Sequence, residues 1–181
     1  MATFTGTAGS DTANASTGTL TGFSGGSLAE LQDGTGDTFT GLGGTDTVSA
    51  GTGDDTITGG SGADVLSGGL GNDLFILAGA DFAAGESIDG SGGTNDRIDL
   101  SGTNDLSTGT VTGIERLIVH SGSTTTVTAS QFASVTSLDA VFDVFGLGIL
   151  NILNVSNINL TTVTTTGYGV NYDTNLFGTS G

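Results

Sequence analysis

Residues 32–76 consist of five consecutive nine-residue units, and this repeat constrains the fold more than any other feature of the chain. The units read QDGTGDTFT, GLGGTDTVS, AGTGDDTIT, GGSGADVLS and GGLGNDLFI. The sixth place of every unit holds an aspartate: Asp37, Asp46, Asp55, Asp64 and Asp73. The eighth place always holds an apolar residue: Phe39, Val48, Ile57, Leu66 and Phe75. A fixed period of this kind is typical of a solenoid in which each unit packs on its neighbours.

Each unit divides into a glycine-rich turn and a short strand. Glycine adopts backbone conformations that are closed to residues with a Cβ, so glycine at the first, second and fourth places favours a turn that exposes carbonyl oxygens. The seventh to ninth places form a strand whose middle residue points inwards. Two units then make one coil of a flattened parallel solenoid, with turns alternating between two edges. The repeat therefore predicts an all-β fold, a parallel β-roll or β-solenoid.

The two edges decide which aspartates are neighbours. Asp37, Asp55 and Asp73 fall on one edge, and Asp46 and Asp64 fall on the other. Strands stack about 4.8 Å apart, so successive carboxylates repel each other by a few kcal/mol at a protein-like dielectric. Ca²⁺ relieves this repulsion, since it takes roughly six to eight carboxylate and carbonyl oxygens in flexible geometry. Mg²⁺ demands a tighter octahedron and Zn²⁺ prefers nitrogen or sulfur, so we expect Ca²⁺, with about three internal sites at the pairs 37/55, 55/73 and 46/64.

The charge and composition exclude several classes of function. The chain has 19 acidic residues and 2 basic residues, which give a formal net charge of -17. Such a chain repels nucleic acid and anionic lipid, and it contains no apolar run long enough to span a bilayer. It has no cysteine, and its only histidine is His120, so no catalytic set can be assembled and we expect no enzyme activity.

The N-terminal flank and the repeats divide into two predicted regions. Residues 1–31 form a cap with one weak nonapeptide, GTAGSDTAN, in which Asp11 stands in the acid column. Ser27 and Glu30 have capping-box spacing, so a one-turn helix or a loop follows. Residues 32–107 form the β-roll, with an insertion at 77–90 whose acids are interpreted as solvated loop residues: Asp81, Glu86 and Asp89.

The C-terminal part of the chain changes in composition. Asp96 and Asp105, nine residues apart, are expected to restore the register after the insertion. Residues 108–181 then form a β-rich C-terminal lobe, made of further parallel coils or a small sandwich, with a short helix after Thr128. Three side chains have open interpretations: Asp54 as an extra ligand or a solvated neighbour, and Tyr168 and Tyr172 as packing residues or a binding site.

The repeats resemble a known family. GGSGADVLS and GGLGNDLFI match the GGxGxDxUx nonapeptide of repeats-in-toxin (RTX, hemolysin-type) proteins at every fixed place, and QDGTGDTFT departs from it at three glycine places. The resemblance covers residues 32–76 closely, and 6–14 and 91–107 loosely. It implies a calcium-bound β-roll, export through a type I secretion system, and sixth-place aspartates that bridge ions on both sides. It also implies that turn glycines offer carbonyls to the ions: Gly51, Gly53, Gly59, Gly60, Gly62, Gly68, Gly69 and Gly71.

The sequence thus predicts a secreted, non-enzymatic, calcium-binding structural protein that folds on binding Ca²⁺, outside the cell or at its surface. The final GTSG repeats the GTAG at 6–9, so we also expect self-association end to end, as in a surface layer, a matrix fibre or an adhesin module. One alternative is a calcium-dependent export and folding module of a larger type I secreted enzyme or toxin. Another is an ice-binding solenoid, prompted by the many threonines, although the sequence does not predict regular flat threonine ranks.

Overall fold

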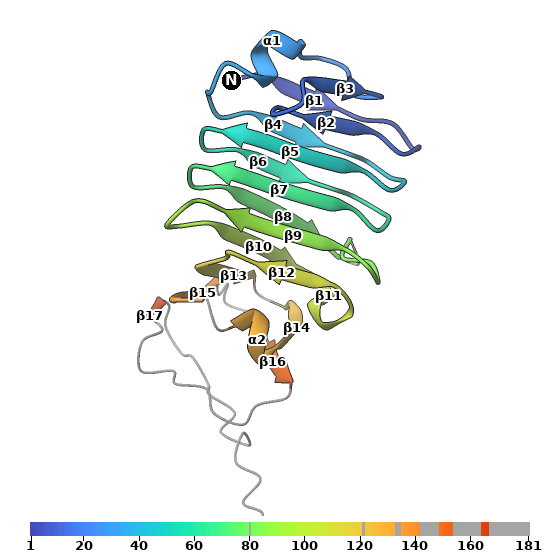
Figure 1. The fold of residues 1–181 in the computed structure, drawn as a ribbon. Helices are drawn as coiled ribbons and strands as arrows, with labels where there is room; N and C mark the ends of the chain where they lie inside the picture. The colour runs from blue at the N-terminus through green and yellow to red at the C-terminus, as the bar shows by residue number, and fades with distance from the viewer. Residues whose placement is uncertain (80, 121, 133–134, 142–148, 154–163, 167–181) are drawn as a thin grey trace, which may run out of the picture.

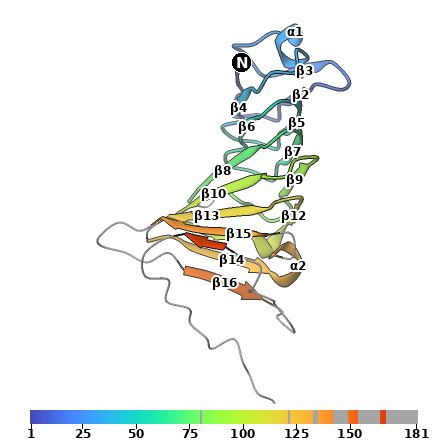
Figure 2. The same ribbon diagram turned by 90° about the vertical axis from the view of Figure 1, so that its left-hand side faces the viewer.

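The chain winds into a stack of coils built from parallel strands (Figure 1; Figure 2). The computed structural model describes residues 1–79, 81–120, 122–132, 135–141, 149–153 and 164–166. Within these residues two short helices accompany the strands, α1 (Leu28–Leu31) and α2 (Ala129–Phe132). The predicted all-β solenoid is therefore confirmed.

The solenoid has two long sheets and a short third one. The first sheet runs in the order β1 (Thr3–Thr5), β4 (Thr38–Thr40), β6 (Thr56–Thr58), β8 (Leu74–Ala78), β10 (Arg97–Ser101), β13 (Arg116–His120), β15 (Ser137–Val141) and β17 (Thr164–Thr166). The second runs β12 (Thr110–Thr112), β9 (Ser87–Ser91), β7 (Val65–Leu70), β5 (Thr47–Thr52), β2 (Thr12–Asn14) and β3 (Thr19–Thr21). The third contains β11 (Thr103–Asp105), β14 (Thr124–Thr128) and β16 (Ile149–Leu153).

The strand register shows that two nonapeptides make one coil. Thr38 pairs with Thr56 and Thr56 pairs with Leu74 in the first sheet, and Thr47 pairs with Val65 in the second. Each of these steps is two units along the sequence. The eighth-place residues all point into the core with at most 2% exposure: Phe39, Val48, Ile57, Leu66 and Phe75. Burial of each large apolar side chain contributes roughly 1.5–3 kcal/mol.

The N-terminal coil belongs to the same two sheets and is covered at its free end. Phe4 of β1 stacks on Phe39 of β4 with ring centroids 5.0 Å apart. Strand β3 pairs antiparallel with β2, and Thr5 forms an antiparallel bridge with Ser24. Helix α1 follows with a complete Ser27–Glu30 capping box, so of the two alternatives for this segment, a one-turn helix or a loop, the structure has the helix.

The C-terminal part continues the coils. Strands β13, β15 and β17 extend the first sheet with parallel pairing, so the described residues form further parallel coils. The predicted helix after Thr128 is α2: the amide of Gln131 donates to the Thr128 hydroxyl, and the Thr128 amide donates to the Gln131 side chain. Tyr168, Tyr172 and the final GTSG lie outside the described residues.

Asp105 does not restore the nonapeptide register, and that prediction was wrong. Its side chain is exposed and accepts a hydrogen bond from the amide of Ser107 at 3.1 Å, which starts the 3-10 helix η1 (Leu106–Thr108). The inward residue of β11 is Asn104, directly before Asp105. The chain turns a corner here into the third sheet, so the acid faces outwards.

Candidate metal centre

The sixth-place acids form two ladders along the edges of the solenoid. In the first ladder each carboxylate accepts a hydrogen bond from the backbone amide of the equivalent residue one coil earlier. The amide-to-carboxylate distances are 2.6 Å for Asp37 to Asp55, 2.8 Å for Asp55 to Asp73, 2.7 Å for Asp73 to Asp96, and 2.9 Å for Asp96 to Glu115. Asp37 itself accepts from the amide of Ala2 at 2.6 Å.

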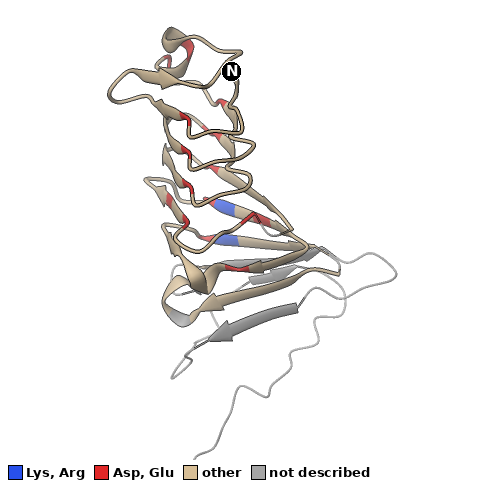
Figure 3. Cartoon of the chain, turned by 90° about the vertical axis from the view of Figure 1, so that its right-hand side faces the viewer, with Lys and Arg blue, Asp and Glu red and all other residues tan. Residues whose placement is uncertain are grey.

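The second ladder runs along the opposite edge. Its members are Asp11, Asp46, Asp64 and Glu86. The amide of Asp11 donates to Asp46 at 2.8 Å, that of Asp46 to Asp64 at 2.8 Å, and that of Asp64 to Glu86 at 3.2 Å. Figure 3 shows acidic residues recurring from coil to coil along the stack. The predicted edge partners therefore lie together, 37 with 55 and 73, and 46 with 64; their binding of Ca²⁺ stays a prediction.

All the ladder carboxylates except the half-buried Glu115 are buried, and most have only one oxygen satisfied. Exposure is 0 or 1% for all five sixth-place aspartates of the repeats, for Glu86 and for Asp96. Six buried oxygens have no hydrogen-bond partner: Asp46 Oδ2, Asp55 Oδ2, Asp64 Oδ2, Asp73 Oδ2, Glu86 Oε1 and Asp96 Oδ2. A buried charged oxygen without a partner is costly. A cation that takes oxygen ligands would satisfy these atoms, so the residues present fit Ca²⁺.

Burial also shifts the proton affinity of the ladders. Desolvation raises the pKa of Asp55 to about 7 and that of Glu86 to about 8. It raises the pKa of Asp46 and that of Asp73 to about 6. The neighbouring carboxylates raise these pKa values further, while the amide hydrogen bonds act in the opposite direction. These four carboxyl groups therefore hold protons more strongly in the metal-free protein than solvated acids do.

The turn glycines permit the coils to stack. The second-place and fourth-place glycines have positive φ, for example +108° at Gly51 and +134° at Gly62. A Cβ at Gly62 would overlap the carbonyl oxygen of Gly44, and one at Gly71 would overlap that of Gly53. The same conformation and close stacking apply to the remaining second-place and fourth-place glycines proposed as ligands: Gly53, Gly60 and Gly69.

The first-place glycines lie against the free carboxylate oxygens. A Cβ at Gly59 would overlap Asp64 Oδ2, and one at Gly68 would overlap Asp73 Oδ2. At Gly41 the added atom would overlap both Asp46 Oδ2 and the carbonyl oxygen of Gly59 in the next coil. In the described part of the chain no three His, Cys, Asp or Glu side chains converge on one point. A cation here would take its ligands from carboxylate pairs and backbone carbonyls.

Sequence reasoning missed Glu86. It was expected to be a solvated loop acid, and this was wrong, because Glu86 is 1% exposed and is the last member of the second ladder. A signal was present: the buried residue Ile88 follows Glu86 by two positions, which is also the spacing of Asp64 and Leu66. The same spacing marks Asp96 with Ile98 and Glu115 with Leu117 as ladder positions.

Other polar groups lie away from the ladders. Asp54 is exposed and accepts from the amide of Asn72 at 2.7 Å. His120 Nε2 lies 2.6 Å from Asp99 Oδ1 on the outer face of the first sheet. The chain's two arginines, Arg97 and Arg116, pair in register on the neighbouring strands β10 and β13, where Figure 3 shows their positions in blue.

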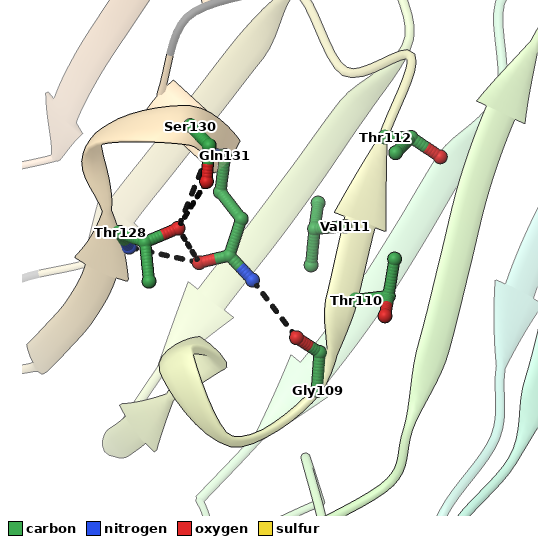
Figure 4. Close-up of a pocket in the computed structure, with 7 residues that line it drawn as sticks. All are labelled: Gly109, Thr110, Val111, Thr112, Thr128, Ser130 and Gln131. Carbon is green, nitrogen blue, oxygen red and sulfur yellow. Dashed lines mark hydrogen bonds between the residues drawn. The ribbon is translucent and has the colours of Figure 1, made fainter.

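A shallow hollow lies between β12 and α2 (Figure 4). The Gln131 amide spans it, donating to the carbonyl oxygens of Leu106 and Gly109 at 2.8 Å and 3.3 Å. Its lining residues carry hydroxyl, amide and apolar groups and no ionisable side chain: Gly109, Thr110, Val111, Thr112, Thr128, Ser130 and Gln131. This lining offers hydrogen-bonding groups, but it has no ionisable side chain that could act as an acid, a base or a charged metal ligand.

The comparisons with known proteins agree with the geometry of the ladders. A family model described as RTX calcium-binding nonapeptide repeat (4 copies) matches residues 40–75. Neither the curated proteins nor the solved structures contain a match to the chain. Among the described residues, no helix has the length and apolar character needed to cross a membrane. Residues 40–75 are thus RTX repeats, and the solenoid that they build is a calcium-binding β-roll.

Proposed function

We propose that this chain is a secreted structural β-solenoid that folds when Ca²⁺ binds and then self-associates in a surface layer, a matrix fibre or an adhesin. One observation carries the calcium-dependent part of this proposal: two buried carboxylate ladders in which six oxygens have no partner. The proposed role is not enzymatic, and it places the function in the folded solenoid itself.

The ladders make folding conditional on the cation. Without it, folding has to bury carboxylates that lie one strand spacing apart, and desolvation disfavours their charged form. When bound, Ca²⁺ supplies positive charge and accepts oxygen ligands in loose geometry. The unfolded chain has no preformed site, so the free energy of binding adds directly to the free energy of folding.

The same dependence suits a protein that works outside the cell. Extracellular calcium modules operate with dissociation constants of about 10⁻⁴–10⁻³ M, and a chain with a net charge of -17 stays expanded where calcium is scarce. Export in the unfolded state through a type I system, followed by folding in calcium-rich surroundings, would use this property. The RTX repeats support this part of the proposal.

The N-terminal end of the solenoid limits the ways in which two molecules can associate. Strand β3 runs antiparallel to β2, and Ser24 pairs antiparallel with Thr5. A second molecule therefore cannot simply continue the parallel ladders from this end. The proposed contact at this end uses the outer edge of β3 or the surface of α1.

A calcium titration followed by circular dichroism and light scattering tests the proposal. We expect Ca²⁺ to convert a disordered monomer into β-rich particles that associate, and we expect Asp64→Ala to raise the calcium midpoint. An unchanged midpoint in this variant would contradict the role of Asp64. Calcium-saturated protein that stays strictly monomeric would argue against self-association.

The alternative role is a calcium-dependent export and folding module of a larger type I secreted enzyme or toxin. The RTX repeats support this role equally, because the ladders would provide the same folding switch. The gene sequence around this chain discriminates the two roles. A catalytic domain in the same reading frame would favour the module.

An observation in the fold also favours ice binding as a second candidate. Thr3, Thr38 and Thr56 pair in register, as do Thr5, Thr40 and Thr58, and all six side chains lie on the outer face of the first sheet. The sequence did not predict flat threonine ranks, and for these three coils that expectation was wrong, because the ranks become visible only through the strand register. In the next coil Leu74 and Ile76 occupy the equivalent positions, so the threonine ranks end there.

The two ranks place hydroxyl groups at a spacing of about 4.8 Å between strands and about 6.7 Å along a strand. Such a surface on a stiff sheet could hydrogen-bond an ordered water lattice. Thermal hysteresis of the calcium-loaded protein is the test, with Thr40→Lys as the disruptive variant. Absence of hysteresis in the unmodified protein would eliminate this candidate.

A further inference from the structure

Glu86 lies outside the matched repeats but occupies the equivalent position in its coil. Val65 pairs with Ser87 and Leu66 pairs with Ile88, so Glu86 precedes β9 as Asp64 precedes β7. The preceding turn spans 79–86, which is two residues longer than the turn at 59–64. The strand register is kept across this longer turn, and the nine-residue sequence pattern is not.

The contacts between Asp64 and Glu86 leave two oxygens unsatisfied. The Asp64 amide donates to Glu86 Oε2 at 3.2 Å. Glu86 Oε1 and Asp64 Oδ2 are both buried and have no hydrogen-bond partner. A cation is the partner that both carboxylates can share.

The backbone around Glu86 is fixed against the next coil. The amide of Thr110 donates to the carbonyl oxygen of Glu86 at 2.8 Å, and the amide of Gly85 donates to that of Thr108 at 3.1 Å. Phe82 of the same turn is 7% exposed, and its ring lies against Gly109. Gly109 takes the next position after Glu86 and has no carboxylate, so the second ladder ends here.

We propose that Asp64 and Glu86 share a calcium ion of their own, beyond the RTX repeats, and that this ion fixes the 79–86 turn against the coil that carries β12. The proposal rests on the calcium binding proposed above. It assigns to the insertion a role as the last ligand-bearing turn of the second ladder. The site joins the repeat array to the C-terminal coils.

Glu86→Gln tests the site, with Asp89→Asn as the matched control. Gln keeps an oxygen that accepts from the Asp64 amide, so a merely structural Glu86 would tolerate the change. Asp89 lies in the same coil, outside the ladders, and accepts from the Ser91 amide at 3.0 Å. Both variants remove one negative charge.

Two measurements give separate outcomes. By equilibrium dialysis with Ca²⁺, Glu86→Gln should bind one ion fewer than the unmodified protein, and Asp89→Asn should bind the same number. In hydrogen exchange with Ca²⁺ present, peptides covering 79–88 should lose protection in Glu86→Gln alone. An unmodified protein that binds Ca²⁺ while Glu86→Gln keeps the same stoichiometry and protection would overturn this site only. An unmodified protein that binds no Ca²⁺ would overturn the proposed function as well.

Discussion

The balance between the charged and the protonated form of a ladder carboxylate depends on whether a cation is bound. Asp46 and Asp55 each accept one amide hydrogen bond from the neighbouring coil, which favours the charged form, and both are buried, which disfavours it. Burial is the larger effect in the metal-free protein, and the pKa values rise. A bound cation reverses the balance by stabilising the charged form.

Asp55→Asn tests this reasoning at one ladder position. The substitution removes a buried charge but keeps an oxygen for the amide of Asp37, so the metal-free protein should become more stable while its stabilisation by Ca²⁺ decreases. Asp54→Asn is the control, because Asp54 is adjacent and exposed. Thermal melting with Ca²⁺ and with a chelator measures both effects. Equal calcium stabilisation in the two variants would rule out Asp55 as a ligand.

The raised pKa values predict how stability depends on pH without calcium. The folded ladders bind protons up to about pH 6–8 at Asp46, Asp55, Asp73 and Glu86, whereas unfolded acids release them near pH 4. The folded state therefore binds more protons in this window, and its stability falls as the pH rises from about 4 to 8. Chelated protein should show more β structure by circular dichroism at pH 5 than at pH 8. With Ca²⁺ the loss towards pH 8 should disappear, because the ion binds the ionised form.

The turns and strands determine how close together the ladder carboxylates of adjacent coils lie. The register brings Asp46 and Asp64 into adjacent coils, and the positive-φ glycines let the turns stack with backbone against backbone. A side chain at such a position would both strain the backbone and separate the coils. The ladders thus depend on the turns as much as on the acids.

Gly62→Ala tests the stacked turn when it is compared with Gly79→Ala. Gly62 has φ +134° and contacts the Gly44 backbone, whereas Gly79 has φ +69° and nothing lies within 4 Å of its added Cβ. Gly79→Ala should cost about 1 kcal/mol, because φ +69° lies in the left-handed region. Gly62→Ala should cost at least about 2 kcal/mol more, because φ +134° lies outside that region and the added Cβ also overlaps the Gly44 backbone. Denaturant unfolding with Ca²⁺ measures the difference. Equal losses would show that stacking contact at Gly62 is unimportant.

Turn length and sheet membership decide how much of the fold can be predicted from the sequence. Inside the repeats, the nine-residue period predicts the inward residues and the edge partners, because each turn has the same length. The period does not predict Glu86, since its turn is longer; the two-residue spacing to Ile88 indicates the position, and the pairing of Leu66 with Ile88 shows it. Asp105 follows Asp96 by nine residues, as the period requires, but it lies outside the ladders because the chain enters another sheet there. The threonine ranks likewise depend on a register that a linear sequence does not display.

The chain combines a high negative charge with a core to which each of the strands β1 to β14 contributes at most two buried apolar side chains. The charge opposes compaction, and the inner column supplies limited apolar burial in each coil. The calcium-free chain should therefore be expanded at neutral pH. Its radius of gyration should be about 45 Å, the value for an unfolded chain of this length. Small-angle X-ray scattering should show a clear decrease on adding Ca²⁺, and an unchanged radius would contradict calcium-driven compaction.

Hydrogen exchange across residues 32–76 shows directly whether the ladders need calcium to fold. The amides of Asp37, Asp55 and Asp46 donate to ladder carboxylates, so their protection reports whether the ladders exist. At neutral pH with Ca²⁺ we predict strong protection of the peptides that contain these amides. After chelation they should exchange at the rate of an unfolded chain. Equal protection with and without calcium would contradict the conclusion that the buried ladders need a cation to fold.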